Sequence, residues 1–553
     1  MYSNKENINI LTALLIEHGV RHAVVCPGSR NAPIVHNLDV CPQIECFPVT
    51  DERSAGFYAL GIAQYTNQPT VVCVTSGTAL LNVLPAVAEA YYQHVPIIII
   101  SADRPLAWID QQDGQTLPQA DALGKFVKKA VSLPEPHDAA EHWLCNRLVN
   151  EVLITCKKGG GTPVHINVPI SEPLFDFSTE SLPTERVFRL DEGTEAMECY
   201  QSLEREFLNS QRPMIVIGQM DRFNAFYLED CLNRLRDHIT VIYESLSFAP
   251  ALHIDKVLGI VEQEEDYSPD AILYVEGTLV SKKLKQFLRR ATTAKTWTVS
   301  RSGDIYDTFQ NLYRVIEGRT GYILDNIAAA IERKQKFEDG LPNHEFHTKW
   351  QKAFAKVANE TKLLNPKYSQ VAVVKEFCKQ LSGADSYHLH AANSMSVRLV
   401  DMFTETYVSC NRGVNGIEGS LSTAAGFSLI ATLPTYCVIG DLSFFYDSNA
   451  LWNQNLHGNF RILLLNNGCG GIFNKFSGLQ NSPAKKPLVM ASHRTSAKGL
   501  CQSYGIEYRA IHNLEELNGT AMQEWMTSDF DRPSLLEVFT DAETDTHEFA
   551  KYV

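Results

Sequence analysis

Two short polar segments in the last third of the chain carry residue types that bind metal ions and phosphates. Gly440-Asp441 and Asn466-Asn467 each follow an apolar run, and Asp441 and Asn467 lie 26 positions apart. Their side-chain oxygens, with a backbone carbonyl from the Gly-rich turn that follows, are the hard ligands that Mg²⁺ prefers and usually shares with a phosphate. N–H groups at the start of the next helix can meet a diphosphate. Either segment alone also fits a helix cap or a turn, but the pair predicts a Mg²⁺–diphosphate site.

A carboxylate in the first third of the chain could exchange protons. Glu52 opens a helical pattern, 54–63, that is rich in small and apolar residues. An apolar site raises the pKa of a carboxylic acid, which suits proton transfer near neutral pH. An acidic residue at a helix start also favours the helix dipole without any catalysis. Further on, residues 75–78 follow a strand pattern and open a helix, but the segment lacks the Lys of a phosphate-binding Walker loop.

Parallel α/β layers are the elements that would position these residues. Short β-rich apolar runs alternate with helical patterns, as expected for strands buried on both faces of a sheet. The runs are 23–26, 70–75, 97–100, 164–168, 214–218, 240–243, 272–275, 296–299, 387–390, 436–439, 461–465 and 534–538. Polar or charged stretches at 176–197 and 332–342 separate three series of runs. We therefore expect three consecutive α/β domains with mostly parallel sheets, at 1–180, 190–335 and 345–553, with ligands at the carboxyl ends of the strands.

The composition excludes several classes of protein. The 553 residues, 44% hydrophobic and 20% charged, are typical of a globular chain with several cores. The net charge of −15 argues against binding to nucleic acid or an anionic membrane. The 13 cysteines form no C-x-x-C pair, which favours a reducing cytoplasm over a disulfide framework or a thiolate zinc site. We expect no signal peptide and no membrane span, because the apolar runs are too short.

Taken together, the motifs resemble one family closely, the SEPHCHC synthases, which are thiamine-diphosphate-dependent enzymes of menaquinone biosynthesis. The matching segments are 26–33, 51–57, 75–79, 101–105, 393–399, 411–417, 440–451 and 471–473. Leu442 stands where the wider superfamily has Gly, and this family is expected to have Leu there. The resemblance covers the first and third domains and is weak in the middle domain.

The resemblance implies a transferase that decarboxylates 2-oxoglutarate on thiamine diphosphate and adds the succinyl unit to isochorismate. It implies Glu52 as the residue that activates the cofactor, with Mg²⁺, or alternatively Mn²⁺, held by Asp441, Asn467 and the carbonyl of Cys469. Ile417 resembles the apolar wedge under the bent cofactor. The full set of cofactor residues implied is Glu52, Thr75, Gly77, Gly416, Ile417, Gly440, Asp441, Leu442, Ser443 and Asn467.

Both implied substrates are dicarboxylates, and Arg suits the bidentate binding of a carboxylate. By resemblance the substrate residues are Ser29, Arg30, Arg104, Gln115, Lys282, Asn393, Ser394, Arg398, Arg412, Ile472 and Phe473. The surroundings of Gln115 depart from the family pattern. Lys283 follows Lys282 where the family has Arg, which weakens a bidentate role there. The family arrangement also implies a homo-oligomer, at least a dimer and expected to be a dimer of dimers, with the active site between subunits.

Other functions remain open at this point. The nearest alternative is another thiamine-diphosphate-dependent 2-oxo acid decarboxylase or carboligase, although a pyruvate enzyme has less need of so many Arg residues. A non-catalytic scaffold would be expected to lack Glu52, Asp441 or Asn467, and all are present. An NAD- or FAD-binding protein would be expected to carry Gly-x-Gly-x-x-Gly after the run 214–218, and the sequence has none there.

Overall fold

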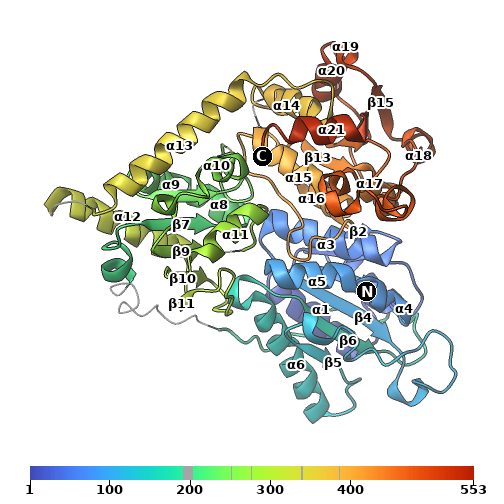
Figure 1. Cartoon of the computed structure of the whole chain (residues 1–553). Helices are drawn as coiled ribbons and strands as arrows, with labels where there is room; N and C mark the ends of the chain where they lie inside the picture. The colour runs from blue at the N-terminus through green and yellow to red at the C-terminus, as the bar shows by residue number, and fades with distance from the viewer. Residues whose placement is uncertain (191–202, 251, 276, 338–340, 385) are drawn as a thin grey trace.

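The computed structural model describes all residues except 191–202, 251, 276, 338–340 and 385, and it contains three parallel sheets in chain order (Figure 1). The first sheet has the order β2-β1-β3-β4-β6-β5. Its strands are β1 (His22–Val25), β2 (Glu45–Pro48), β3 (Thr70–Val74), β4 (Ile97–Asp103), β5 (Ala130–Ser132) and β6 (Val164–Pro169). Its helices are α1 (Glu6–Glu17), α2 (Ala32–Asp39), α3 (Glu52–Thr66), α4 (Thr78–Asn82), α5 (Leu84–Gln93) and α6 (Ala139–Lys157).

The second sheet has the order β11-β10-β9-β7-β8. Its strands are β7 (Pro213–Ile217), β8 (Thr240–Tyr243), β9 (Ala271–Val275), β10 (Lys295–Ser300) and β11 (Leu312–Glu317). The helices of this part are α8 (Arg222–Tyr227), α9 (Glu229–Arg236), α10 (Ile254–Val261), α11 (Lys282–Arg290), α12 (Thr320–Phe337) and α13 (His344–Leu363). Helix α13 packs Trp350 and Val357 into the core of this sheet. Residues 332–337 of the second charged stretch form the end of α12, where Glu332 pairs with Arg234. Residues 338–340 of that stretch, and residues 191–197 of the first polar stretch, lie outside the described residues.

The third sheet has the order β12-β13-β14-β16-β15. Its strands are β12 (His388–Ala391), β13 (Thr435–Gly440), β14 (Phe460–Asn466), β15 (Glu507–Ile511) and β16 (Ser534–Phe539). Its helices are α14 (Gln370–Leu381), α15 (Met395–Phe403), α16 (Ser420–Ile430), α17 (Asp441–Tyr446), α18 (Lys498–Tyr504), α19 (Leu514–Leu517), α20 (Ala521–Thr527) and α21 (Ala542–Phe549). The expected fold class, three consecutive parallel α/β units, is confirmed. In the described part of the chain no helix is both long and apolar enough to span a membrane.

Each of the apolar runs in the sequence overlaps a strand, whereas β2, β5, β11 and β15 were not predicted. All four lie at an edge of their sheet. An edge strand pairs on one side only and has solvent on the other, so its residues need not be apolar. The burial of β11 is typical, because only Ile316 among its residues is fully buried. Edge position alone does not explain the omission, because the edge strands β8 and β12 are buried and were predicted. The four missed strands also carry exposed residues, which remove the apolar pattern.

The first and third units share one apolar core, in which α3 packs against α16 (Figure 1). Glycines allow the two helices to come together. A Cβ added at Gly61 would lie 2.0 Å from the carbonyl oxygen of Thr423, and one added at Gly426 would lie 2.3 Å from the carbonyl oxygen of Tyr58. Any larger residue at these positions must push the helix backbones apart. This contact sets the position of the first turn of α3, which carries Glu52, relative to the third sheet.

We predict that Gly61→Ala destabilises the protein by about 1–3 kcal/mol or more, because the new methyl group overlaps the backbone of α16. The measurement is the urea midpoint followed by circular dichroism. The matched control is Gly259→Ala in α10, where the added Cβ would meet only the end of Lys283 at 4.0 Å. That control should be neutral or gain up to about 1 kcal/mol from helix propensity. Equal midpoints for Gly61→Ala and wild type would contradict the close packing of α3 and α16.

Candidate functional site

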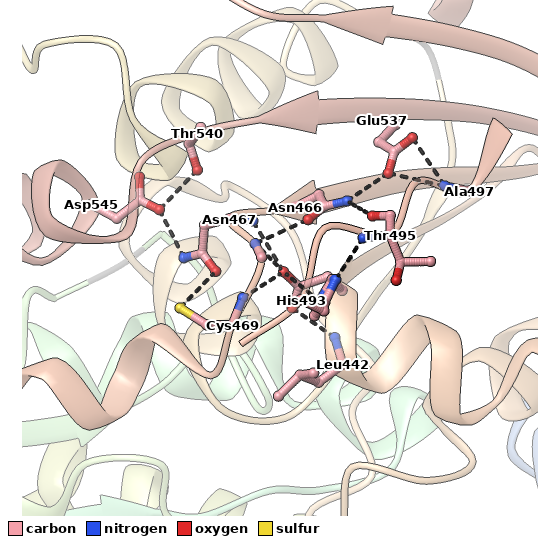
Figure 2. A network of polar contacts seen from close by, with 12 residues as sticks. Leu442, Asn466, Asn467, Cys469, His493, Thr495, Ala497, Glu537, Thr540 and Asp545 are labelled. Carbon is pink, nitrogen blue, oxygen red and sulfur yellow. Dashed lines mark hydrogen bonds and ion pairs between the residues drawn. The ribbon is translucent and has the colours of Figure 1, made fainter. Parts of the chain in front are cut away.

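Asp441 joins the two polar loops that the sequence places 26 positions apart. It begins α17 directly after β13, and only 3% of its surface is exposed. Its Oδ2 accepts the backbone N–H groups of Asn467 (3.1 Å), Gly468 (2.7 Å) and Cys469 (3.2 Å), while Oδ1 accepts that of Leu442 (2.7 Å) (Figure 2). Burial raises the pKa of Asp441, and these N–H groups act in the opposite direction by stabilising the carboxylate. One carboxylate therefore ties together the ends of β13 and β14.

A neighbouring carboxylate fixes the amide of Asn467. The Nδ2 of Asn467 donates to Oδ2 of Asp545 at 2.9 Å (Figure 2). Asp545 is itself held by the Thr540 hydroxyl and the Gln370 N–H, both at 2.8 Å. Burial raises the pKa of Asp545 to about 6. Because the nitrogen of the Asn467 amide is committed to Asp545, its Oδ1 is the atom left to serve as a ligand.

Asn466, the residue before Asn467, is held by a second buried carboxylate, Glu537. Asn466 donates to Glu537 at 2.7 Å and to the Thr495 carbonyl at 2.9 Å, and its Oδ1 accepts the Gly468 N–H at 3.0 Å (Figure 2). Glu537 is fully buried and also accepts the Ala497 N–H. Sequence analysis missed both Asp545 and Glu537. They lie more than 70 positions after the loop that they support, so no local pattern marks them.

The residues present fit a magnesium–diphosphate group. At Gly440 an added Cβ would meet only the Ser396 hydroxyl, at 4.0 Å, so the start of α17 is open. Among the described residues no cluster of three or more His, Cys, Asp or Glu side chains could hold a metal ion. A metal here would therefore take oxygens from Asp441, from Asn467 and from the Cys469 carbonyl, which at present accepts only the Gly471 N–H (2.9 Å). Such an oxygen set, completed by phosphate, suits Mg²⁺.

Glu52 is the first residue of α3, behind the helix cap Asp51. Its side chain is half-buried and accepts a hydrogen bond from Nδ2 of Asn82 at 3.2 Å. The hollow around it is lined by Thr50, Asp51, Glu52, Arg53, Asn82, Asn449 and Trp452. Within one chain most of the residues that line this hollow are polar or charged, which differs from the apolar surroundings expected from the sequence. The apolar residues of α3 come later in the helix and face α16, which leaves the first turn at the open end of the interface.

The predicted turn at Thr75–Gly77 meets two other predicted segments of the first unit. Gly77 has a φ of +84°, and an added Cβ there would lie 3.3 Å from the backbone carbonyl of Gln115. A Cβ at Gly28, next to Ser29, would lie 2.4 Å from the Cβ of Thr75. The side chains of Ser29 and Gln115 are exposed. The structure thus brings the three segments together at one end of the first sheet.

The two candidate arginines of the first unit already have carboxylate partners. Arg30 pairs with Glu172 at 2.9 Å, and Arg104 pairs with Asp113 at 2.5 Å. Burial raises the pKa of Asp103, and the positive charges of Arg104 and Arg30 act against that shift. Both guanidinium groups therefore lie near Asp103 at the end of β4.

The two candidate arginines of the third unit have no ion pair among the described residues. Arg398 donates to the Ser394 carbonyl at 2.6 Å, and Arg412 donates to Oδ1 of Asn393 at 3.1 Å and to the Leu279 carbonyl at 3.4 Å. Burial and the nearby charge of Arg412 lower the pKa of Arg398. Their positive charges are thus close together and form no ion pair with a described side chain, although Asp255 and Glu244 are near enough to raise the pKa of Arg398. This arrangement is expected where an anionic ligand binds.

Two lysines extend this group of cations. Lys282 begins α11 in the middle unit, and Lys475 ends the short helix at Gly471–Lys475. Burial, followed by the charges of Arg398 and Lys282, lowers the pKa of Lys475. Lys283 instead donates to the backbone carbonyl of Asp255 at 3.4 Å. Sequence analysis missed Lys475, although its place two residues after Phe473 was a usable signal.

Apolar and strained residues lie beside these cations. Ile417 is 42% exposed, and Ile472 and Phe473 are half-buried, so none of the three is an ordinary core residue. Ser394, the residue directly before α15, has a φ of +73°, a conformation that residues other than glycine seldom adopt and that often occurs at functional sites. Asn393 links the two groups, because its Nδ2 donates to the Gly416 carbonyl at 2.9 Å while its Oδ1 accepts from Arg412.

The fold and this site define a class of protein, the thiamine-diphosphate enzymes. Residues 8–123 match the family model of the thiamine pyrophosphate enzyme N-terminal TPP-binding domain. Residues 392–538 match the model of the corresponding C-terminal TPP-binding domain. The two matched ranges contain Glu52 and the pair Asp441 and Asn467, respectively.

Similar proteins of known name identify the family within this class. A 2-succinyl-5-enolpyruvyl-6-hydroxy-3-cyclohexene-1-carboxylate synthase of Phocaeicola vulgatus is 42% identical, over 100% of this chain and 98% of its own length. An enzyme of the same name from Bacteroides thetaiotaomicron is 40% identical, over 100% of this chain and 99% of its own length. One from Desulfotalea psychrophila is 35% identical, over 97% of this chain and 98% of its own length. The chain belongs to this family, the SEPHCHC synthases.

We predict that Asp545→Ala weakens divalent-metal binding by about 10- to 100-fold, since supporting residues that orient a metal ligand contribute on that scale. Loss of Asp545 frees the Asn467 amide to rotate. The measurement is a Mn²⁺ titration followed by electron paramagnetic resonance in the presence of thiamine diphosphate. The control is Asp541→Ala, which removes the same charge and the cap of α21 without touching Asn467. Equal Mn²⁺ affinity in Asp545→Ala and in the control would contradict the orienting role.

Proposed function

We propose that this chain catalyses the SEPHCHC synthase reaction of menaquinone biosynthesis, the decarboxylation of 2-oxoglutarate and transfer of the succinyl unit to isochorismate. The observation that carries the proposal is the position of Asn393. Its two amide atoms bond Arg412, a candidate substrate ligand, and the carbonyl of Gly416, which precedes the candidate cofactor wedge Ile417. Substrate and cofactor segments are thereby joined through one side chain.

The residues of the proposed cofactor site come from two units of the chain, the first and the third. Thiamine diphosphate, when bound, supplies the carbon nucleophile that attacks a 2-oxo acid and promotes loss of CO₂. Asp441, Asn467 and the Cys469 carbonyl would hold Mg²⁺ and thereby the diphosphate. Glu52 would exchange a proton with the pyrimidine ring, and its bond from Asn82 keeps its carboxylate oriented. Ile417, exposed and apolar, would pack against the cofactor.

The proposed substrate site uses cations that lack a carboxylate partner in the described residues. Arg398, Arg412 and Lys282 are available to the carboxylates of two dicarboxylic substrates. The half-buried Ile472 and Phe473 would cover the ring of isochorismate, and Ser394 would donate a hydroxyl. Arg30 and Arg104 would bind a carboxylate only by sharing or leaving Glu172 and Asp113.

We also propose that the active site forms between subunits of a homo-oligomer, at least a dimer. Support comes from the separation of functional groups within one chain. In the part that the structure describes, no hydrogen bond or ion pair joins Glu52, Arg30 or Arg104 to Asp441, Asn467 or Arg398. The hollow around Glu52 is also open on one side, so a second copy could supply the apolar surface expected there. We place the enzyme in a reducing compartment, the cytoplasm, because every cysteine that the structure describes is a free thiol.

We predict that the purified chain consumes 2-oxoglutarate and isochorismate together only when thiamine diphosphate and a divalent metal are present. The measurement follows CO₂ release and the mass of the product in one reaction. Stripping with a chelator should abolish turnover, and Mg²⁺ or Mn²⁺ with thiamine diphosphate should restore it. A product built from pyruvate, or full turnover after stripping, would contradict the proposal and favour another carboligase or another chemistry.

We predict that Glu52→Gln lowers kcat by about 10²–10⁴-fold, the usual contribution of a positioned acid or base. The amide keeps the size of the side chain and its contact with Asn82 but cannot exchange a proton, so thiamine diphosphate binding should persist. The control is Glu6→Gln, at the first position of α1, which should retain full activity. Turnover in Glu52→Gln within a factor of about two of wild type would refute the proton-transfer role.

A further inference from the structure

The loop at Cys410–Val414, which carries Arg412, is held by all three units of the chain. The middle unit binds its backbone twice, through Nε2 of Gln219 to the Cys410 carbonyl (2.8 Å) and the Thr278 hydroxyl to the Arg412 carbonyl (3.1 Å). Asn411 and Asn393 hold it to the third unit. The contact to the first unit comes from one buried carboxylate, Glu89.

Glu89 lies on α5 and is only 3% exposed. Its Oε1 accepts the N–H of Gly413 and its Oε2 accepts the N–H of Val414, both at 2.7 Å. The side chain of Gln93 donates to the same carboxylate. The approach is close, because a Cβ added at Gly413 would lie 2.8 Å from the Glu89 carbonyl oxygen and 3.0 Å from the Cβ of Tyr92. The carboxylate thus accepts hydrogen bonds from two consecutive backbone N–H groups directly after Arg412.

This arrangement fixes the position of Arg412 without neutralising it. Burial raises the pKa of Glu89, while the N–H groups of Val414 and Gly413 and the charge of Arg412 favour the carboxylate. No ion pair forms between Glu89 and Arg412 within the usual contact distance, and the carboxylate is directed at the two backbone N–H groups. The guanidinium is directed instead to Asn393 and to the Leu279 carbonyl, neither of which carries a charge.

We propose that Glu89 is a positioning residue for substrate binding, which acts by holding the backbone beside Arg412 and so fixing where that guanidinium meets a substrate carboxylate. The inference rests on the proposed function, because it takes Arg412 as a substrate ligand. A purely structural carboxylate would affect the stability of the fold alone. A positioning carboxylate affects the affinity for the dicarboxylate that Arg412 contacts, and it does so only while Arg412 is present.

The test compares Glu89→Gln with wild type in the complete enzyme, saturated with thiamine diphosphate and Mg²⁺. In the variant an amide NH₂ must face one of the two N–H groups, so the loop shifts. KM should rise about tenfold or more for one of the two substrates, with kcat changed by less than about threefold, since small displacements of a binding group cost affinity on this scale. Cofactor affinity should be unchanged.

The control is Asp270→Asn in the middle unit, where a carboxylate likewise accepts two consecutive N–H groups, from Gln211 (3.1 Å) and Arg212 (2.9 Å), with no candidate ligand beside it. It should lower thermal stability without changing KM. If Glu89→Gln does not fold, the conservative Glu89→Asp, which can reach only one N–H, should show the same KM increase to a smaller degree.

A double-mutant cycle decides whether the effect passes through Arg412. In an Arg412→Lys background, Glu89→Gln should change KM by less than about twofold further, because the group that it positions is gone. An equal KM increase in both backgrounds, or an unchanged KM in a stable Glu89→Gln variant, would overturn the positioning role. A wild-type chain that makes no SEPHCHC product would instead refute the proposed function, so the two failures are distinguishable.

Discussion

The close contact between α3 and α16 is the constraint on which the site depends. Gly61 and Gly426 let backbone meet backbone, and the apolar core on either side of them runs without interruption from the first unit into the third. Helix α3 begins at Glu52, and α16 follows the loop that carries Ile417. Because the proposed active sites form between subunits, a shift of one helix along the other would displace the candidate proton-transfer group of one site relative to the candidate cofactor wedge of another.

Buried carboxylates that accept backbone N–H groups hold the loops at the ends of the strands. Asp441 accepts from the loop after β14, Glu89 from the loop after Arg412, and Glu244 from Val280 and Ser281, directly before Lys282. Burial raises the pKa of Glu244 to about 7. A carboxylate that is buried needs such partners, because unpaired charge is costly in a protein interior. The same hydrogen bonds fix the backbone of each loop beside a candidate ligand-binding residue.

The candidate site is positively charged, whereas the chain as a whole is negatively charged. The protein carries a net charge of −15, yet Arg398, Arg412, Lys282 and Lys475 lie near one another without ion pairs in the part of the chain described. Burial, and after it the charge of a neighbouring cation, lowers the pKa of Arg398 and of Lys475, whereas Asp255 raises both. A bound dicarboxylate would offset both the burial and the mutual repulsion of these cations.

The sequence by itself determined the fold class, the strands that are buried on both faces, and the pairing of Asp441 with Asn467, because buried strands and metal-binding loops leave local patterns. Only the tertiary structure decided the rest. The edge strands β2, β5, β11 and β15 have no apolar pattern because they carry exposed residues, unlike the edge strands β8 and β12. Asp545, Glu537 and Glu89 act on loops 70 to more than 300 positions away. Their roles depend on contacts between segments that are far apart in the sequence, so no local sequence pattern predicts them.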